Sequence, residues 1–141
     1  LIDLGLTDIE VAESIDLPFA ELHKLSESIV WIRYKDYDEE IGIGEAEMSS
    51  EALARLTGTN KVRLVVDFRG THLAFTNEAR EFFARSESHS KKRLSQALLI
   101  DGLAHKLVAN FYMNFNRPNC PVAIFDDPEK ALAWTRRLQN E

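Results

Sequence analysis

The chain has 141 residues, of which 45% are hydrophobic, and this is enough to build the core of one domain. Its formal net charge of −6 lacks the basic footprint that broad nucleic-acid binding requires, so we expect no nucleic-acid partner. A single cysteine, Cys120, excludes an internal disulfide, which fits a reducing compartment and predicts a cytoplasmic protein. No apolar run reaches the ~18 residues of a membrane span, so neither a membrane span nor a signal peptide is expected.

The N-terminal part of the chain predicts a helix followed by a hairpin. Residues 1–18 contain alternating acidic and apolar side chains that suggest a short, peripheral amphipathic helix. Residues 19–25 and 28–35 predict two strands, because the second run is rich in β-branched and aromatic residues. The polar residues Ser26 and Glu27 between them predict the turn of a hairpin.

Beyond the hairpin, helices and strands alternate to the end of the chain. Helices are predicted over 44–56, 77–85 and 102–115 and from 128 onwards, and strands over 62–68, 94–100 and 121–125. Gly58 marks the end of the first of these helices, and Asp127 with Pro128 marks the start of the last. Strands that are joined by helical crossovers lie parallel. The pattern therefore predicts an α/β fold: a mixed sheet of about five strands, with an N-terminal hairpin, then parallel strands, and four main helices.

Several segments within residues 19 to 138 resemble a known family. They are VVDFRG at 65–70, NEAREFF at 77–83, QALLID at 96–101, VANFYMNFN at 108–116 and PNCPVAIFDDPEKALAW at 118–134. In their order they resemble STAS domains, the fold of the SpoIIAA-type anti-sigma-factor antagonists, and in particular the SpoIIAA-like bacterial proteins of unknown function. The resemblance implies a single STAS-like domain over 1–141 that acts as a non-catalytic protein-binding or regulatory module. Two alternatives stay open: a carrier of a small apolar ligand or lipid, as in the related CRAL-TRIO fold, and an enzyme.

The sequence suggests two roles for Thr76. In the anti-sigma-factor antagonists the phosphorylated serine lies at the start of the corresponding helix, typically in an Asp-Ser pair, and this position falls on Thr76. Phe75 occupies the acidic position, so the pair is absent. A threonine at an N-cap stabilises a helix by about 1 kcal/mol without any regulatory role. The sequence predicts that Thr76 caps the helix from Asn77, and phosphorylation stays the alternative.

Other polar residues follow the predicted parallel strands, where open α/β sheets bind their ligands. Arg69 could bind a phosphate or carboxylate of a partner, or pair with Asp101 or another acid of the same rim. His72 is a candidate acid or base, but no nucleophile and orienting group accompany it in the sequence. We therefore list Thr76, Arg69, His72 and Asp101 as possible regulatory or partner-binding residues and expect no catalysis. The histidines have no ligand spacing with Cys120, so no metal or cofactor is expected.

The predicted helix over 102–115 has two apolar stripes. The first, expected to be buried, consists of Leu103, Leu107, Phe111 and Phe115. The second consists of Ala104, Val108 and Tyr112. Two stripes exceed what one sheet face needs, so the helix is deeply buried, lines an apolar pocket, or provides a self-association surface. The last reading predicts a two-fold homodimer through the second stripe.

Overall fold

The computed structural model describes residues 3–86, 92–111 and 119–139. Its strands are β1 (Glu13–Asp16), β2 (Ala20–Ser26), β3 (Ile29–Tyr34), β4 (Val62–Asp67), β5 (Arg93–Leu99) and β6 (Val122–Phe125). Its helices are α1 (Ile43–Thr57), α2 (Asn77–Arg85), α4 (Leu103–Phe111) and α5 (Pro128–Gln139). The strands form one six-stranded sheet in the order β1-β2-β3-β4-β5-β6. β1, β2 and β3 pair antiparallel, and β3 to β6 pair parallel.

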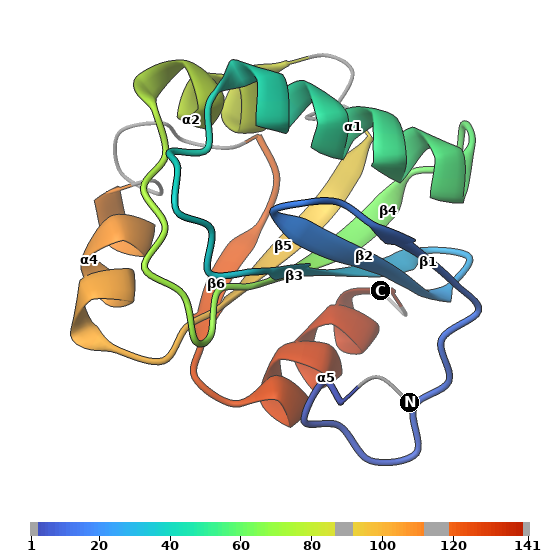
Figure 1. Cartoon of the computed structure of the whole chain (residues 1–141). Helices are drawn as coiled ribbons and strands as arrows, with labels where there is room; N and C mark the ends of the chain where they lie inside the picture. The colour runs from blue at the N-terminus through green and yellow to red at the C-terminus, as the bar shows by residue number, and fades with distance from the viewer. Residues whose placement is uncertain (1–2, 87–91, 112–118, 140–141) are drawn as a thin grey trace.

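The sheet is covered on both faces. Helices α1 and α2 lie on one face and α5 lies on the other, together with the N-terminal segment, while α4 lies beside the sheet near the loop that precedes α2 (Figure 1). Successive side chains of a strand point to opposite faces. Val30, Ile32 and Tyr34 accordingly join the core under α1 and α2, whereas Ile29 and Trp31 join the core under α5. Burial on both faces explains why the parallel strands read as nearly continuous apolar runs.

The turns that end two elements depend on glycine. Gly58 follows α1 with φ +60° and donates its backbone N–H to the carbonyl of Ala54, which closes the helix. Gly70 follows β4 with φ +76° and donates its N–H to Asp101 Oδ2 at 2.9 Å. Both backbone conformations lie in the left-handed region that glycine adopts without a steric penalty.

The predicted N-terminal helix is wrong. Residues 13–16 form β1, which pairs with β2 so that Glu13 lies opposite Lys24, and the described residues before it form no helix. The segment docks on α5 instead: Leu4 is 1% exposed, and the backbone N–H of Thr7 donates to Glu129 Oε1 at 2.8 Å. A short isolated helix is marginal in water, so pairing with the free edge of β2 and burial of Leu4 prevail. β1 consequently adds a sixth strand to the sheet of about five strands that the sequence predicts.

The predicted buried stripe of α4 is also wrong. Leu103 is 73% exposed and Leu107 is 63% exposed. The buried side of this helix carries Ala109 and the largely covered ring of His105, because α4 packs on the loop after β4 and not flat on the sheet. The side chains of Ala104, Val108 and Phe111, and the whole of Tyr112 and Phe115, lie outside the described residues. None of the described helices has both the length and the apolar character that a membrane span needs.

Candidate functional site

A pocket of about 90 Å³ lies on the α2 side of the sheet, and we call it the aromatic pocket. Its floor is formed by β3, β4 and β5, and its walls come from the loop between β4 and α2, from α2 and from α4. The rings around it are Tyr34, Phe68, Phe75, Phe83 and His105. The pocket lies toward the carboxyl ends of the parallel strands, the region in which open α/β sheets bind their ligands.

The aromatic rings pack against one another as a connected cluster. Tyr34 stacks on Phe68 with ring centroids 5.2 Å apart and planes 4° from parallel. Phe75 meets both rings edge-on, at 5.6 Å from Tyr34 and 6.0 Å from Phe68. Stacked and edge-to-face pairs stabilise beyond the area they bury. The pocket wall on this side is therefore built from rigid, mutually supported rings.

Three polar side chains on the pocket wall hold the loop between β4 and α2. The Thr71 hydroxyl donates to the carbonyl of Phe68 at 2.7 Å, and Arg80 Nη1 donates to the carbonyl of Phe75 at 2.9 Å. His105 Nε2 lies 2.7 Å from the carbonyl of Thr71. A carbonyl oxygen only accepts, so Nε2 carries the proton that it donates. All three side chains thus act on backbone carbonyls of one loop.

The other ring nitrogen of His105 faces Asp101. His105 Nδ1 lies 3.0 Å from Asp101 Oδ1, and the second carboxylate oxygen of Asp101 accepts the N–H of Gly70. Asp101 therefore connects the turn after β4 to the start of α4. Both nitrogens of His105 have partners, and the imidazole serves to join α4 to the loop.

Gln96 is the polar residue on the floor of the pocket. It lies in the middle of β5, is 6% exposed, and its Oε1 atom has no hydrogen-bond partner among the described residues. In register it lies between Leu64 of β4 and Val122 of β6. Neither neighbouring side chain can bond to the amide.

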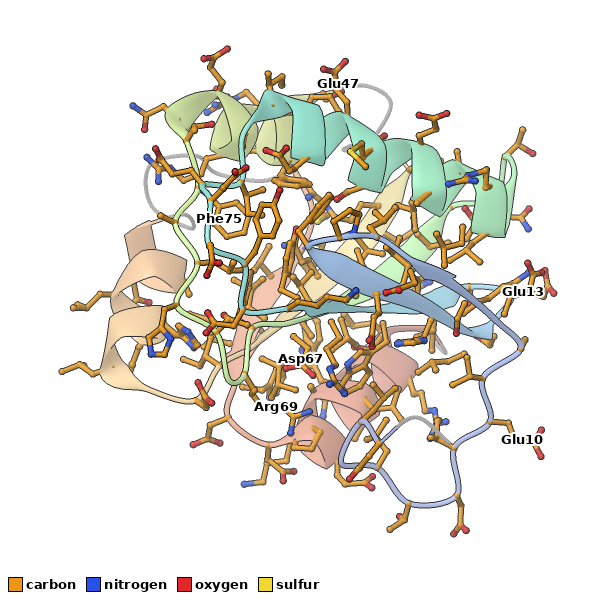
Figure 2. The ribbon with its side chains drawn as sticks, in the orientation of Figure 1. Glu10, Glu13, Glu47, Asp67, Arg69 and Phe75 are labelled. Carbon is orange, nitrogen blue, oxygen red and sulfur yellow. The ribbon has the colours of Figure 1, made fainter. Side chains whose placement is uncertain are left out.

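Arg69 lies on the other face of the sheet. Figure 2 shows Asp67 and Arg69 next to each other on the α5 side, and Phe75 on the α2 side. Arg69 Nε and Nη2 donate to the two carboxylate oxygens of Asp67 at 3.0 and 2.9 Å, and Trp31 Nε1 donates to Oδ2 at 3.2 Å. These hydrogen bonds raise the pKa of Arg69 above its usual range. Arg69 thus pairs with an acid of its own chain, which is Asp67 and not Asp101, the partner that the sequence suggested as one option.

Nη2 of Arg69 also donates to the carbonyl of Leu4 at 2.9 Å. The guanidinium therefore ties the buried Asp67 to the N-terminal segment. A bidentate pair of this kind uses the fork that would otherwise bind a phosphate or carboxylate of a partner.

Thr76 caps α2, as the sequence predicts. Its hydroxyl oxygen accepts the N–H of Ala79 at 3.1 Å, and its backbone is extended. The side chain of His72 is 91% exposed, and its backbone N–H donates to Asp36 Oδ1. Thr76, His72, Asp101 and Arg69 each take part in separate local interactions and do not form one site.

One arrangement of catalytic type was not expected from the sequence. Ser14 Oγ lies 2.7 Å from His23 Nδ1, and His23 Nε2 lies 3.1 Å from Glu21 Oε1. Ser14 faces His23 across the antiparallel pair of β1 and β2, and Glu21 lies two residues before His23 on the same face. This face is the α5 side, since His23 pairs with Trp31, so the group is separated by the sheet from the aromatic pocket. His23 is 2% exposed, and a buried imidazole needs partners at both nitrogens.

Two of the pocket residues have sequence features that indicate their positions. Gln96 is a polar residue within the apolar run 94–100, and polar residues in such runs are rarely buried without a reason. His105 follows Asp101 at the four-residue spacing that brings side chains together on a helix. Arg80 lacks any such signal, because its role depends on how the loop before α2 is folded.

Comparison with solved structures supports the predicted fold. The chain is similar to the crystal structure of an uncharacterized protein from the DUF3478 family with a SpoIIAA-like fold, from Shewanella loihica PV-4. The two share 13% sequence identity over 88% of this chain and 99% of that chain, with a TM-score of 0.59. At this identity the likeness shows the fold alone, and it confirms a SpoIIAA-like α/β fold.

The comparisons of sequence give a family without an activity. No curated protein matches the chain. A family model described as a domain of unknown function, DUF7793, matches residues 23–139, which is most of the described sheet and helices. The chain therefore belongs to the DUF7793 family.

Proposed function

We propose that this domain is a non-catalytic binding module of the regulatory kind, and that the aromatic pocket is its binding site. One observation carries the proposal. The pocket at the carboxyl ends of the strands is apolar, and three of the polar side chains on its wall bond to backbone carbonyls. Thr71, Arg80 and His105 each donate to the loop between β4 and α2. Groups used in this way preserve the shape of a pocket and are poorly placed to act on a substrate.

The alternative of a lipid carrier has less support. Ligand sites for drug-sized molecules usually have volumes of roughly 300–1,000 Å³. The aromatic pocket, at about 90 Å³, is far smaller. It suits a compact molecule or the end of a larger one, and not an enclosed acyl chain.

The enzyme alternative depends on Ser14, His23 and Glu21. Acyl transfer needs a substrate pocket and oxyanion donors beside the nucleophile. The aromatic pocket lies on the opposite face of the sheet from Ser14 and offers no substrate site beside it. We therefore interpret the hydrogen bonds of His23 as a structural link between β1 and β2.

Two finer features belong to the same proposal. A regulatory module needs a way to signal, and Thr76 follows Phe75, a ring of the pocket wall, so phosphorylation at the cap would act next to the binding site. The exposed Leu103 and Leu107 on α4 add apolar surface to the helix that we expect to form a homodimer. Another regulatory protein remains the alternative partner.

The proposal is tested by a fragment screen with NMR detection on the whole chain. Small fragments are expected to shift the methyl signals of Leu73 and Leu98, which line the pocket, and to be recovered unchanged. Ala109→Phe places a ring in the pocket and should abolish these shifts, because Ala109 lines it from α4. Ile43→Phe, at an exposed position of α1 away from the pocket, is the matched control and should leave them intact.

Two results would contradict the proposal. Either no fragment shifts the pocket signals, or the bound fragments are consumed. A fluorophosphonate probe checks the enzyme alternative directly. Labelling of Ser14 in the folded protein, lost in His23→Ala, would show that this serine is an activated nucleophile.

A further inference from the structure

The aromatic pocket contains a polar atom for which the protein supplies no partner. Gln96 Oε1 is buried and has no hydrogen-bond partner among the described residues, and Gln96 lines the pocket. Most buried polar atoms in folded proteins are bonded, and an exception calls for an explanation such as a water or a ligand. The neighbours of Gln96 in register, Leu64 and Val122, are apolar.

The remaining polar groups of the pocket do not reach this atom. Thr71 Oγ1, Arg80 Nη1 and His105 Nε2 donate to backbone carbonyls of the loop. Arg80 Nη2 donates to Asn77 Oδ1. Gln96 lies on the strand floor, on the same face as Leu98. The floor therefore presents one unpaired acceptor beneath a ring of aromatic walls.

From this we infer that the aromatic pocket binds a compact, largely apolar molecule that carries one O–H or N–H donor, and that this donor bonds to Gln96 Oε1. The inference rests on the proposed function, because it assigns a ligand class to the same pocket. Apolar walls with a few placed polar groups are the usual composition of small-molecule sites. The rings of Tyr34, Phe68 and Phe75 would contact the apolar body of the ligand.

The volume limits the size of this molecule. An engineered cavity of about 150 Å³ binds benzene. The aromatic pocket, at about 90 Å³, is smaller, so a five-membered ring is a more suitable probe. Pyrrole and furan form a matched pair: they have nearly the same shape, but only pyrrole has an N–H donor.

The experiment is an NMR titration of the whole chain with pyrrole and with furan. Pyrrole should bind about fivefold to tenfold more tightly than furan, the ratio that one net hydrogen bond gives. In Gln96→Leu, which removes the acceptor at similar volume, the two probes should bind equally. If Gln96→Leu does not fold, Gln96→Met tests the same point with an unbranched side chain.

Ser95→Ala is the matched control. Ser95 Oγ is also buried and has no partner among the described residues. It is adjacent to Gln96 on β5, however, and points to the opposite face, with Ala97 and Leu99. The preference for pyrrole should therefore persist in Ser95→Ala.

The possible failures are distinguishable. Equal binding of the two probes to the wild-type chain, or a preference that survives in Gln96→Leu, would overturn the role of Gln96 and leave the pocket as a binding site. A preference for furan would show that the amide presents its N–H₂ group, which also overturns the inference. If neither probe nor any fragment shifts the pocket signals, the proposed function itself fails.

Discussion

Removal of the Arg69 guanidinium should destabilise the fold through the carboxylate of Asp67. The Asp67 side chain is 1% exposed and accepts four N–H groups: Trp31 Nε1, the backbone N–H of Arg69, and Nε and Nη2 of Arg69. Arg69→Met keeps most of the apolar stem and removes the last two donors with their charge. Asp67 then keeps two hydrogen bonds but has no cation beside it.

The size of the effect follows from burial. Breaking a buried ion pair by removing one partner costs about 3–5 kcal/mol, because it leaves an uncompensated buried charge. Arg69 is 28% exposed, and two donors remain on Asp67, so we expect the low end, about 3 kcal/mol of the free energy of unfolding. The lost bond to the Leu4 carbonyl should also loosen the N-terminal segment on α5.

Urea denaturation followed by tryptophan fluorescence measures this loss. Arg33→Met is the matched control: Arg33 also donates to a carbonyl of the N-terminal segment, that of Asp3, but its side chain is 42% exposed and has no buried carboxylate. The control should lose less than about 1 kcal/mol. A loss below about 1 kcal/mol in Arg69→Met, with an unchanged denaturant slope, would refute the reasoning that Asp67 depends on this guanidinium.

The double variant separates charge from packing. Asp67→Leu in the Arg69→Met background removes both charges and should recover part of the lost stability, because replacing a buried pair by apolar groups is often nearly neutral. Trp31 Nε1 loses its acceptor in this variant, so recovery should be incomplete. A double variant that is less stable than the sum of the single losses would contradict this account.

Four further results are expected. Thr76→Ala should lower the free energy of unfolding by about 1 kcal/mol and Thr76→Ser should restore most of it, since Thr76 Oγ1 accepts the N–H of Ala79; a neutral alanine variant would refute the importance of the cap. Gln96→Leu should raise the stability of the unliganded protein by about 1 kcal/mol, because a buried amide oxygen without a partner is replaced by an apolar group, and a loss of similar size would show that this oxygen has a partner. Leu107→Glu should convert a dimer to a folded monomer in light scattering, whereas a wild-type chain that is monomeric at high concentration contradicts the homodimer. Burial raises the pKa of the Cys120 thiol, although Arg93 opposes the shift, so less thiolate is present at pH 8 than in an unfolded chain; iodoacetamide should react more slowly with the native protein than in urea, and equal rates would disprove this.

Local patterns predicted most of the sheet and its covering helices. The helix expected over 77–85 is found as α2, and the strand expected over 62–68 is found as β4 at Val62–Asp67. These elements combine a clear periodicity with their own end signals, such as the threonine before α2. The fold class followed, because alternating strands and helices leave few arrangements.

The two main errors have the same physical origin. The N-terminal residues have a pattern compatible with a helix, yet they form β1, because β2 offers an unpaired edge and α5 offers a surface for Leu4. The stripe of Leu103 and Leu107 is regular, yet it faces solvent, because His105 and Asp101 set the rotation of α4 on the loop. In both cases contacts between distant residues outweigh a weak local preference.

The residues of the candidate site also divide into those whose roles the local sequence predicts and those whose roles depend on distant contacts. Composition and periodicity were sufficient for the α/β class, the parallel strands and the capping role of Thr76, because each depends on neighbours within a few positions of the chain. The pairing of Arg69 with Asp67, the Ser14–His23–Glu21 contacts and the pocket around Gln96 depend on which strands and loops lie side by side. A side chain acquires a partner or lacks one only when the packed chain surrounds it, so the unpaired amide oxygen of Gln96 is seen in the tertiary structure and not in the order of residues.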